Sequence, residues 1–524
     1  MSHIDLVAGL VMGTGPGFLD SNLLVGIVVI PLAAAASLLV VPVQQRQTIR
    51  VIAIVAATVT MALSFYVFGL YSHEEGGFQF QRSWNWLELP GTWLLGERGI
   101  TLSLGIDGIS ALMVLLTGIV MFAGVIVSWN IGPRSKDFFI LYFLLIGGVF
   151  GVFVSLDLFF LFFFYELAVL PMYLLIGIWG SSSDFRIFVR TKEYSAMKLM
   201  LYLVAGSVFI WIALVAIFAK ADLGTFNYVA IMNGTSFSPE FQRFVFPLLM
   251  VGFGVLAGMW PFHTWSPDGH VAAPTAVSMV HAGVLMKLGA YGILRVGIGL
   301  LPSGAEDWIP VLIGLGTVNV IYGAISAMGQ RDLKYVVGYS SVSHMGYVLM
   351  GIATLNHLGV TGAVLQMFSH GIMTALFFAV VGAIYDRTHT REVAVLEGMA
   401  KRMGTIAAFF VIAGLTSIGL PGLSGFVAEL LVFLGLFQVY PVLGVLGIIG
   451  AAITAVYILR LIAKVFFGEL DERWAAKSDF SKPEIFSSSV LVVFLLLMGL
   501  LPFPFISTID ASVLTLIGAV TGSG

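Results

Sequence analysis

Apolar runs long enough to cross a lipid bilayer follow one another through almost the whole sequence, and this pattern restricts the fold more than any other feature. Each run has about 20 residues, the length that an α-helix needs to cross the hydrocarbon layer. Of the 524 residues, 59% are hydrophobic and only 10% are charged, whereas a soluble domain carries about 25% charged residues. The sequence therefore predicts an all-α integral membrane protein.

Fourteen spans are predicted where apolar runs alternate with loop residues. They fall near residues 22–42, 49–71, 104–129, 137–155, 157–180, 195–219, 243–266, 271–296, 307–329, 335–354, 360–386, 404–437, 441–467 and 485–507. We group them as 1–136 with spans one to three, 137–300 with spans four to eight, 301–468 with spans nine to thirteen, and 469–524 with span fourteen. The longest polar stretch is 72–103.

Lysine and arginine are distributed unevenly between alternate loops, and this asymmetry predicts an orientation. Of the 25 basic residues, 18 lie in the loops of one side, five lie in the loops of the other, and Lys198 and Lys287 lie within spans. Basic loops remain on the cytoplasmic side, so both termini are expected on the outer side. The first twenty residues lack a basic segment, and we expect no cleaved signal peptide.

Several classes of function are disfavoured by composition. The sequence contains no cysteine, which excludes iron–sulfur clusters held by thiolates and any disulfide framework. The net charge is −3, without a basic stripe that would indicate nucleic-acid binding. No nucleotide-binding loop or flavin fingerprint is present, so we expect no cofactor on this chain.

Five ionisable residues lie on five different spans at about the same predicted depth. They are Glu166, Lys287, His344, His370 and Glu429. Their depth follows from the helical rise of about 1.5 Å per residue. A charge near the middle of the bilayer costs at least about 2.5–3.5 kcal/mol, so such residues usually have a partner or a function. Because a buried lysine changes its affinity for protons with its surroundings and histidine titrates near neutrality, the layer indicates a proton path.

Proline and glycine interrupt two of the predicted spans. They gather in LAGMWPFHTWSPDGHVAAP (256–274) and in SIGLPGLSGF (417–426). Backbone freed from a membrane helix is tolerated only inside protein or beside water. Broken helices at corresponding places in two halves of a chain indicate inverted repeats around a transport site. We therefore expect two inverted five-helix repeats, spans 4–8 and 9–13, with breaks in spans 7 and 12.

Each residue of the charged layer also has a structural interpretation. Glu166 and Lys287 can form salt bridges that hold helices together, and Glu429 can stabilise the helix that follows a break. His344 and His370 can be hydrogen-bonding partners between helices.

Other polar residues lie nearer the predicted membrane edges. Lys198 can extend its ammonium to the interface, and Asp107 is expected at a helix end. For His263, Asp268 and His270, a structural loop network is as plausible as a role in proton exit.

These motifs resemble those of the antiporter-like membrane subunits of bacterial complex I, the proton-pumping NADH–quinone oxidoreductase, a family that includes subunits of Mrp-type Na⁺/H⁺ antiporters. The resemblance rests on LGIDGIS, FFYELAVLPMYLLIGIWG, EYSAMKLMLY, WPFHTWSPDGHVAAPTAVSM, AGVLMKLGAYGILR, DLKYVVGYSSVSHMGY, MFSHGIMTALFF and LPGLSGFVAE, between about residues 100 and 435. It implies proton translocation in a bacterial inner membrane, coupled to electron transfer in partner subunits. Those partners are expected to carry FMN and iron–sulfur clusters and to bind quinone, and paralogous antiporter-like subunits are expected beside this chain.

The resemblance also implies roles by position. Glu166 matches the glutamate of span five, Lys287 the central lysine of span eight, and His344 and His370 the relay histidines. Glu429 matches the terminal residue of span twelve. A glutamate there, and the expectation that no long lateral helix follows span fourteen, resemble the subunit M branch more than the L and N branches.

The sequence departs from the family at one important position. The family usually carries a lysine in span seven that pairs with the span-five glutamate, whereas this chain has Leu256 there. We hypothesise that Lys198, or the additional histidine His281, is the partner of Glu166 instead.

Three other functions fit parts of the sequence. An Mrp-type Na⁺/H⁺ antiporter subunit shares the lysine and glutamate pattern, and a stand-alone solute carrier could contain inverted repeats. A structural scaffold is the third, although the layer of charges argues against it.

Overall fold

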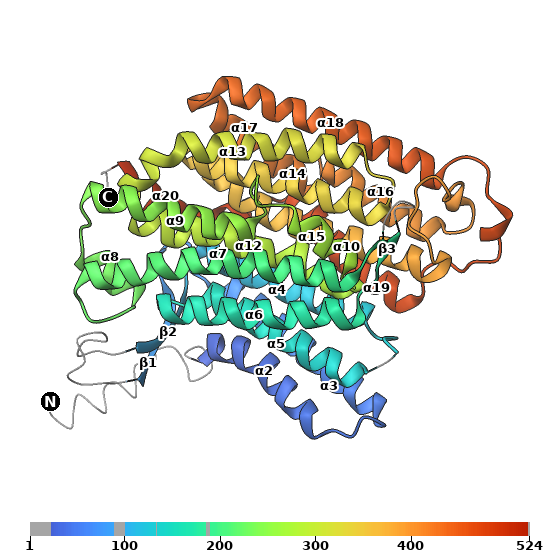
Figure 1. Cartoon of the computed structure of the whole chain (residues 1–524), viewed down its shortest axis with the longest axis horizontal. Coiled ribbons are helices and arrows are strands. Elements are labelled where there is room, and N and C mark those ends of the chain that lie inside the picture. The colour runs from blue at the N-terminus through green and yellow to red at the C-terminus, as the bar shows by residue number, and fades with distance from the viewer. Residues whose placement is uncertain (1–21, 88–99, 133, 185–188, 522–524) are drawn as a thin grey trace.

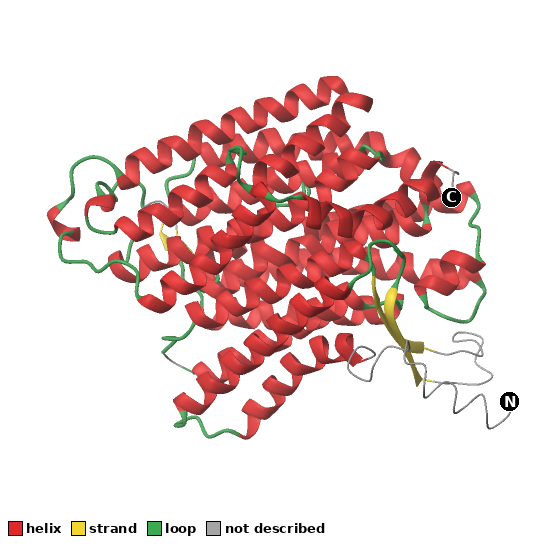
Figure 2. Cartoon of the chain, turned by 180° about the vertical axis from the view of Figure 1, so that it is seen from behind, coloured by secondary structure: helices red, strands yellow, loops and turns green. Residues whose placement is uncertain are grey.

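The computed structural model describes residues 22–87, 100–132, 134–184 and 189–521 and consists of long helices packed side by side (Figures 1 and 2). Thirteen of the described helices are long and apolar enough to cross a membrane. The prediction of an all-α membrane protein with many spans is therefore confirmed. The first twenty residues, and Glu88 and Arg98 of the polar stretch 72–103, lie outside the described residues.

The first half of the chain supplies the helices of predicted spans one to eight. They are α2 (Leu23–Val40), α3 (Arg46–Leu70), α4 (Gly108–Val127), α5 (Ser135–Val154), α6 (Leu158–Trp179), α7 (Lys192–Ala221), α9 (Pro239–Ala257), α10 (Trp265–Ala272), α11 (Thr275–Val280), η2 (His281–Leu285), α12 (Met286–Gly292) and η3 (Ile293–Ile298). The last four form one continuous span, Thr275–Ile298, in which η2 and η3 are π-helical turns.

The second half supplies the remaining spans. Its helices are α13 (Pro302–Met328), α14 (Leu333–Ala353), α15 (His357–Thr388), α16 (Gly404–Ser417), α17 (Ser424–Val439), α18 (Pro441–Phe466), α19 (Lys482–Leu500) and α20 (Phe503–Thr521). Shorter elements connect the spans: β1 (Gln79–Leu87), β2 (Ile100–Ile106), β3 (Ser183–Asp184), β4 (Val189–Arg190), α8 (Tyr228–Gly234), η4 (Met399–Lys401) and η5 (Glu472–Trp474). Strands β1 and β2 pair in an antiparallel hairpin, as do β3 and β4.

Polar residues directly before the apolar runs explain where many helices begin. The side chains that accept hydrogen bonds from backbone amides of the first turn belong to Asp107, Asp157, Thr191, Asn227, Ser238, Asp332 and Asn356. Such caps satisfy amides that have no partner within the helix. The expectation that Asp107 lies at a helix end is confirmed.

Both predicted helix breaks are present. Helix α9 ends at Ala257, the next residue, Gly258, has a left-handed φ of +74°, and α10 starts only at Trp265. The side chain of Asn319 on α13 bridges this break. Its Nδ2 donates to the Gly258 carbonyl at 2.9 Å, and its Oδ1 accepts from the Trp260 backbone amide at 2.5 Å. The second break separates α16 from α17, where Gly419 has a φ of +69°.

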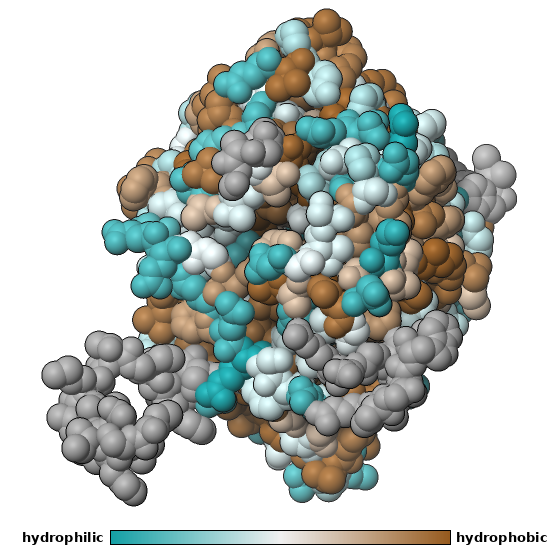
Figure 3. Space-filling model, turned by 90° about the vertical axis from the view of Figure 1, so that its left-hand side faces the viewer, coloured by the Kyte–Doolittle hydropathy of each residue, from teal (hydrophilic) through white to brown (hydrophobic). Residues whose placement is uncertain are grey.

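The centre of the bundle is formed by α4, the span Thr275–Ile298 and α15. In their most apolar stretches, 94%, 100% and 100% of the residues are buried, whereas the value is 33% for α3 and α18. The peripheral helices present large apolar side chains outward, as a surface in contact with lipid does. Figure 3 shows hydrophilic residues distributed among apolar ones at the end of the molecule that carries the β1–β2 hairpin, α8 and α20.

Two details differ from the sequence predictions. A single span was expected over 485–507, but α19 ends at Leu500 and α20 begins at Phe503, because Pro502 cannot continue a helix and disfavours helical backbone at the residue before it. Helix α20 then packs on α4, where Ser512 Oγ accepts from the Gly108 amide at 2.9 Å. Arg295, which stands at the end of the predicted span 271–296 and was counted among the five basic residues of the outer loops, lies buried within η3.

Candidate functional site

Lys287 lies in the middle of a fully buried span, directly after a π-helical turn. Its side chain has 0% exposure, and its Nζ donates to the Ala282 carbonyl and lies 2.8 Å from Nδ1 of His370 on α15. A π-helical turn is rare and often marks a functional position. Because an uncompensated charge is costly at this depth, a neutral imidazole nitrogen at hydrogen-bonding distance is a natural recipient for a proton of Lys287.

A second histidine and a carboxylate continue this contact. The imidazole rings of His370 and His344 lie 5.4 Å apart, centre to centre. His344 Nδ1 lies 3.5 Å from Glu429 Oε1 and 3.2 Å from the Gln366 amide nitrogen. On its other side, His344 Nε2 lies 2.9 Å from Ser417 Oγ at the second helix break. Lys287, His370, His344 and Glu429 therefore form a row from α12 through α15 and α14 to α17.

The row is buried and contains one acid. All four side chains are at most 5% exposed. The lysine and the glutamate lie at opposite ends of the row, and each of the two imidazoles between them can take up and release a proton.

Glu166 lies apart from this row. It is half-buried on α6 and faces α7, where Ser207 interacts with its carboxyl group. Its Oε1 is buried and has no hydrogen-bond partner among the residues that the structure describes. Leu256, at the position of the usual family lysine, is buried and apolar.

Lys198 and His281 do not contact Glu166 in this structure. Lys198 Nζ lies 2.8 Å from Asp268 Oδ2. His281 is stacked on Trp265 and on His270, with ring centres 5.2 Å and 4.0 Å apart. No contact in the described structure therefore supports the hypothesis that Lys198 or His281 replaces the usual lysine as the partner of Glu166.

Asp268 is the centre of a polar network that sequence reasoning found only in part. Arg190 donates to its Oδ1, and the hydroxyl of Tyr335 donates to the same oxygen at 3.0 Å. Asp268 is 2% exposed, so the two cations Arg190 and Lys198 compensate a buried carboxylate. Arg190 lies in strand β4, within the connection between α6 and α7, and no sequence signal places it beside Asp268.

A second buried ion pair joins Asp107 to Arg295. The two side chains lie 2.5 Å apart and are about 5% exposed. The sequence predicted Asp107 at a helix end but not its partner, because Arg295 was counted with the basic residues of the outer loops.

Comparison with known proteins identifies the family. Residues 155–454 match the family model described as NADH:quinone oxidoreductase/Mrp antiporter, membrane region. NADH-quinone oxidoreductase subunit M of Rhodobacter capsulatus is 38% identical over 92% of this chain and 93% of its own length. The subunit M of Rickettsia conorii is 34% identical over 88% of this chain and 91% of its own length.

Solved structures show the same fold. A chain of respiratory complex I from Thermus thermophilus with bound NADH superposes with a TM-score of 0.84 at 26% identity, covering 95% of this chain and 99% of that one. A chain of the Mrp complex from Dietzia superposes with a TM-score of 0.81 at 20% identity, covering 96% of this chain and 99% of that one, and shows the fold alone. The chain belongs to the NADH:quinone oxidoreductase/Mrp antiporter family of membrane subunits.

Proposed function

We propose that this chain is a proton-translocating membrane subunit of a redox-driven NADH:quinone oxidoreductase. The observation that carries the proposal is the buried row Lys287–His370–His344–Glu429, which joins four helices by short contacts. Relatives at 34–38% identity are NADH-quinone oxidoreductase subunits M, which favours a redox-driven pump over an Mrp-type antiporter.

Each residue of the row has a role that follows from its contacts. Lys287 holds a proton at Nζ and passes it to Nδ1 of His370, which lies 2.8 Å away. His370 and His344 carry the proton between their neighbouring rings, and Glu429 accepts it as a carboxylate. A change in the charge near either end changes the proton affinity of the whole row, which provides the coupling to a distant redox reaction.

The other candidate residues belong to the first half of the chain. Glu166, Lys198 and His281 are proposed to transfer protons toward Lys287, and residues 137–300 and 301–468 are proposed to be the two inverted repeats. The two helix breaks support the repeats, because they occur once in each unit, at Gly258 and Gly419.

Partners supply the redox chemistry in this proposal. We assign FMN, iron–sulfur clusters and the quinone site to other subunits, since the chain has no cysteine for a cluster. Paralogous antiporter-like subunits and lipid would surround it in a bacterial inner membrane, with both termini on the outer side. The last point is supported by the uneven distribution of basic loops.

Proton pumping by the assembled complex in inverted membrane vesicles tests the function, with electron transfer measured in parallel. Arginine cannot release its proton in proteins, so Lys287→Arg preserves the charge and removes the carrier, whereas Lys287→Ala removes both. We expect both variants to assemble and to lose pumping. The control is Lys220→Ala, which removes an exposed lysine at the end of α7. Normal pumping by assembled Lys287→Ala would overturn the proposal.

A further inference from the structure

An uncharged side chain, Gln366, contacts the buried row at the point where His344 faces Glu429. Gln366 lies on α15 four residues before His370, so both side chains project from the same face of the helix. It is 1% exposed, and its Nε2 lies 3.2 Å from Nδ1 of His344. The same ring nitrogen lies 3.5 Å from Oε1 of Glu429. The amide therefore occupies the nitrogen that faces the carboxylate.

The chemistry of the amide determines where His344 carries its proton in this arrangement. An amide nitrogen donates hydrogen bonds but does not accept them, so Nδ1 of His344 is unprotonated while Nε2 of Gln366 bonds to it. The neutral imidazole then carries its proton on Nε2, which lies 2.9 Å from Ser417 Oγ. A hydroxyl group can donate or accept, so Ser417 fits either form of the ring. Of these two partners, Gln366 is the one that selects the form.

In the selected form, His344 has no proton that Glu429 can take. The proton on Nε2 faces Ser417. The distance of 3.5 Å between Nδ1 and Oε1 of Glu429 exceeds the usual length of an N–H···O hydrogen bond, about 2.7–3.2 Å. A proton that comes from His370, whose ring lies 5.4 Å away centre to centre, must therefore be placed on Nδ1 before it can continue to the carboxylate.

The amide of Gln366 can accommodate this proton by exchanging its two ends. Its Oε1 is buried without a hydrogen-bond partner among the residues that the structure describes, so no bond at that end opposes a rotation. The last side-chain torsion of glutamine is broad and roughly two-fold, and the nitrogen and the oxygen are similar in size. Once Nδ1 of His344 carries a proton, the amide oxygen accepts a hydrogen bond from it, whereas the amide nitrogen would meet another donor.

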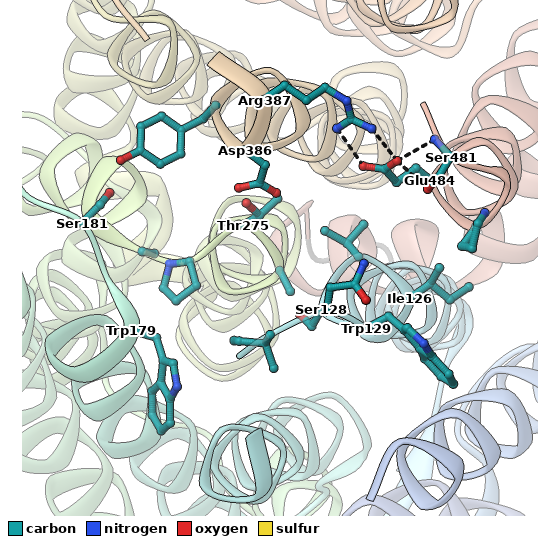
Figure 4. A pocket seen from close by; sticks show the side chains of 18 of the residues that line it. Ile126, Ser128, Trp129, Trp179, Ser181, Thr275, Asp386, Arg387, Ser481 and Glu484 are labelled. Carbon is teal, nitrogen blue, oxygen red and sulfur yellow. Dashed lines mark hydrogen bonds and ion pairs between the residues drawn. The ribbon is translucent and has the colours of Figure 1, made fainter. Parts of the chain in front are cut away.

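This contact is separate from the cavity of about 790 Å³ among the helix ends that carry the basic loops (Figure 4). One wall of the cavity contains a double salt bridge, in which Arg387 donates to both carboxylate oxygens of Glu484 at 3.0 and 2.8 Å. Neither Gln366 nor the imidazole of His344 lines the cavity. The cavity therefore brings no competing hydrogen-bond donor to Nδ1, and the amide determines its state.

We propose that Gln366 is a positioning residue that separates the arrival of a proton at His344 from its delivery to Glu429. The proposal rests on the proposed function, because it concerns one step of the row. A proton leaves a nitrogen of His370 and forms an N–H bond at Nδ1 of His344 as the amide turns its oxygen toward it. The proton then leaves Nδ1 and forms an O–H bond on the carboxylate of Glu429. When the amide nitrogen returns to Nδ1, the proton on Glu429 has no acceptor on His344.

Two substitutions of Gln366 test this role in the assembled complex in inverted membrane vesicles. Methionine has a similar length but lacks the amide donor and the amide oxygen. A neutral glutamic acid resembles the amide, because one oxygen donates and the other accepts, whereas a carboxylate only accepts. We expect Gln366→Met to pump roughly tenfold more slowly at every pH, which is about the factor that one hydrogen bond is worth. Gln366→Glu should pump like the parent at acidic pH and lose pumping as the pH rises.

The pH dependence of Gln366→Glu distinguishes positioning of the proton from a structural role. The titratable groups that face His344 or its direct neighbours are Lys287, Tyr347, His370, Glu429 and Tyr457. All of them are present in the parent as well, so the ratio of pumping to electron transfer is divided by that of the parent at each pH. A side chain that only fills space would give a deficit that does not change with pH.

Gln438→Met is the matched control, because it makes the same exchange at an exposed position near the end of α17. It should pump as the parent does. Should Gln366→Met not assemble, the pH dependence of Gln366→Glu decides the question. Pumping at the parent rate by assembled Gln366→Met, or a Gln366→Glu ratio that is the same at every pH, would overturn the role of Gln366. The loss of pumping in Lys287→Ala would then still support the proposed function.

Discussion

The position of the Glu429 carboxylate depends on a glycine in the helix break before it. Gly419 has a φ of +69°, and a Cβ atom at this position would lie 2.9 Å from Glu429 Oε2. A side chain at Gly419 would therefore strain the backbone and displace the carboxylate that ends the row.

Gly419→Ala is accordingly expected to reduce proton pumping while the complex assembles. The left-handed backbone costs a residue other than glycine about 1–2 kcal/mol, which a bundle of this size can tolerate. Pumping and electron transfer in vesicles measure the effect. Gly177→Ala on α6 is the matched control, because beyond its chain neighbours and the nearby backbone of its own helix no atom lies within 4 Å of the added Cβ. If both variants pump equally, the glycine does not position Glu429.

At this scale the sequence predicted which helices carry the buried charged residues but not the contacts that these residues make. Counting residues along helices placed five ionisable groups in one layer, and Lys287, His370, His344 and Glu429 do meet. Glu166 does not contact them, because depth leaves the rotation of a helix about its axis undetermined. The partners Gln366 and Ser417 carried no sequence signal, since both are common polar residues in any helix bundle.

Among the elements, the break between α9 and α10 depends on a side chain from another helix. Asn319 of α13 forms hydrogen bonds with the Trp260 amide and with the carbonyls of Gly258 and Val342. Asn319→Ala removes the partner of the Trp260 amide and of the buried Gly258 carbonyl, and a buried polar group without a partner costs about 1–3 kcal/mol. We expect a lower midpoint temperature of the solubilised complex in thermal denaturation.

Asn233→Ala, at an exposed position near the end of α8, serves as the control for that substitution. Its midpoint temperature should equal that of the unmodified complex. An equal midpoint for Asn319→Ala would show that the break is held by packing alone.

Asp479 in the loop before α19 caps the start of α16. Its carboxylate accepts from the backbone amides of Thr405, Ile406 and Phe480 at 2.7, 3.1 and 2.8 Å. Burial raises the pKa of Asp479, but these hydrogen bonds outweigh it, and the net pKa is below the ordinary value. The ionised form is therefore stabilised by folding, and this contribution is present above the unfolded pKa of about 4 and is lost as the pH falls through the folded pKa.

Asp479→Ala is expected to destabilise the complex by about 1 kcal/mol at neutral pH, as the loss of a helix cap does. The difference in midpoint temperature between variant and parent should decrease as the pH falls below about 4, because the carboxylate of the unfolded parent takes up a proton there and that of the folded parent does so at still lower pH. A difference that stays constant with pH would contradict a role of the ionised carboxylate.

The elements themselves were largely predictable, and the exceptions have physical causes. Long apolar runs predicted the helices, and clusters of proline and glycine predicted both helix breaks. The β1–β2 hairpin lies in a polar stretch whose strands lack a strict alternation of apolar and polar residues, for example in QFQRSWNWL. The π-helical turns η2 and η3 depend on packing around a fully buried span, which no local pattern encodes.

On the scale of the whole molecule, one buried ion pair connects elements that lie far apart in the sequence. Arg295 bonds to Asp107 at the start of α4, and its guanidinium lies 4.8 Å from the ring of Phe78 beside the hairpin and 5.7 Å from that of Tyr228 in α8. The residue after Asp107, Gly108, bonds to Ser512 of α20. The pair therefore holds together the end of the bundle to which these elements belong.

Removing one partner should consequently destabilise the protein more than removing both. Arg295→Met leaves the Asp107 carboxylate uncompensated, and the loss of one member of a buried pair costs about 3–5 kcal/mol. Asp107→Asn removes only the charge, because asparagine caps a helix as well as aspartate does. We expect the double variant to have a higher midpoint temperature than Arg295→Met alone, measured on the solubilised complex. Additive losses would instead show that Arg295 acts through its aromatic contacts and not through the carboxylate.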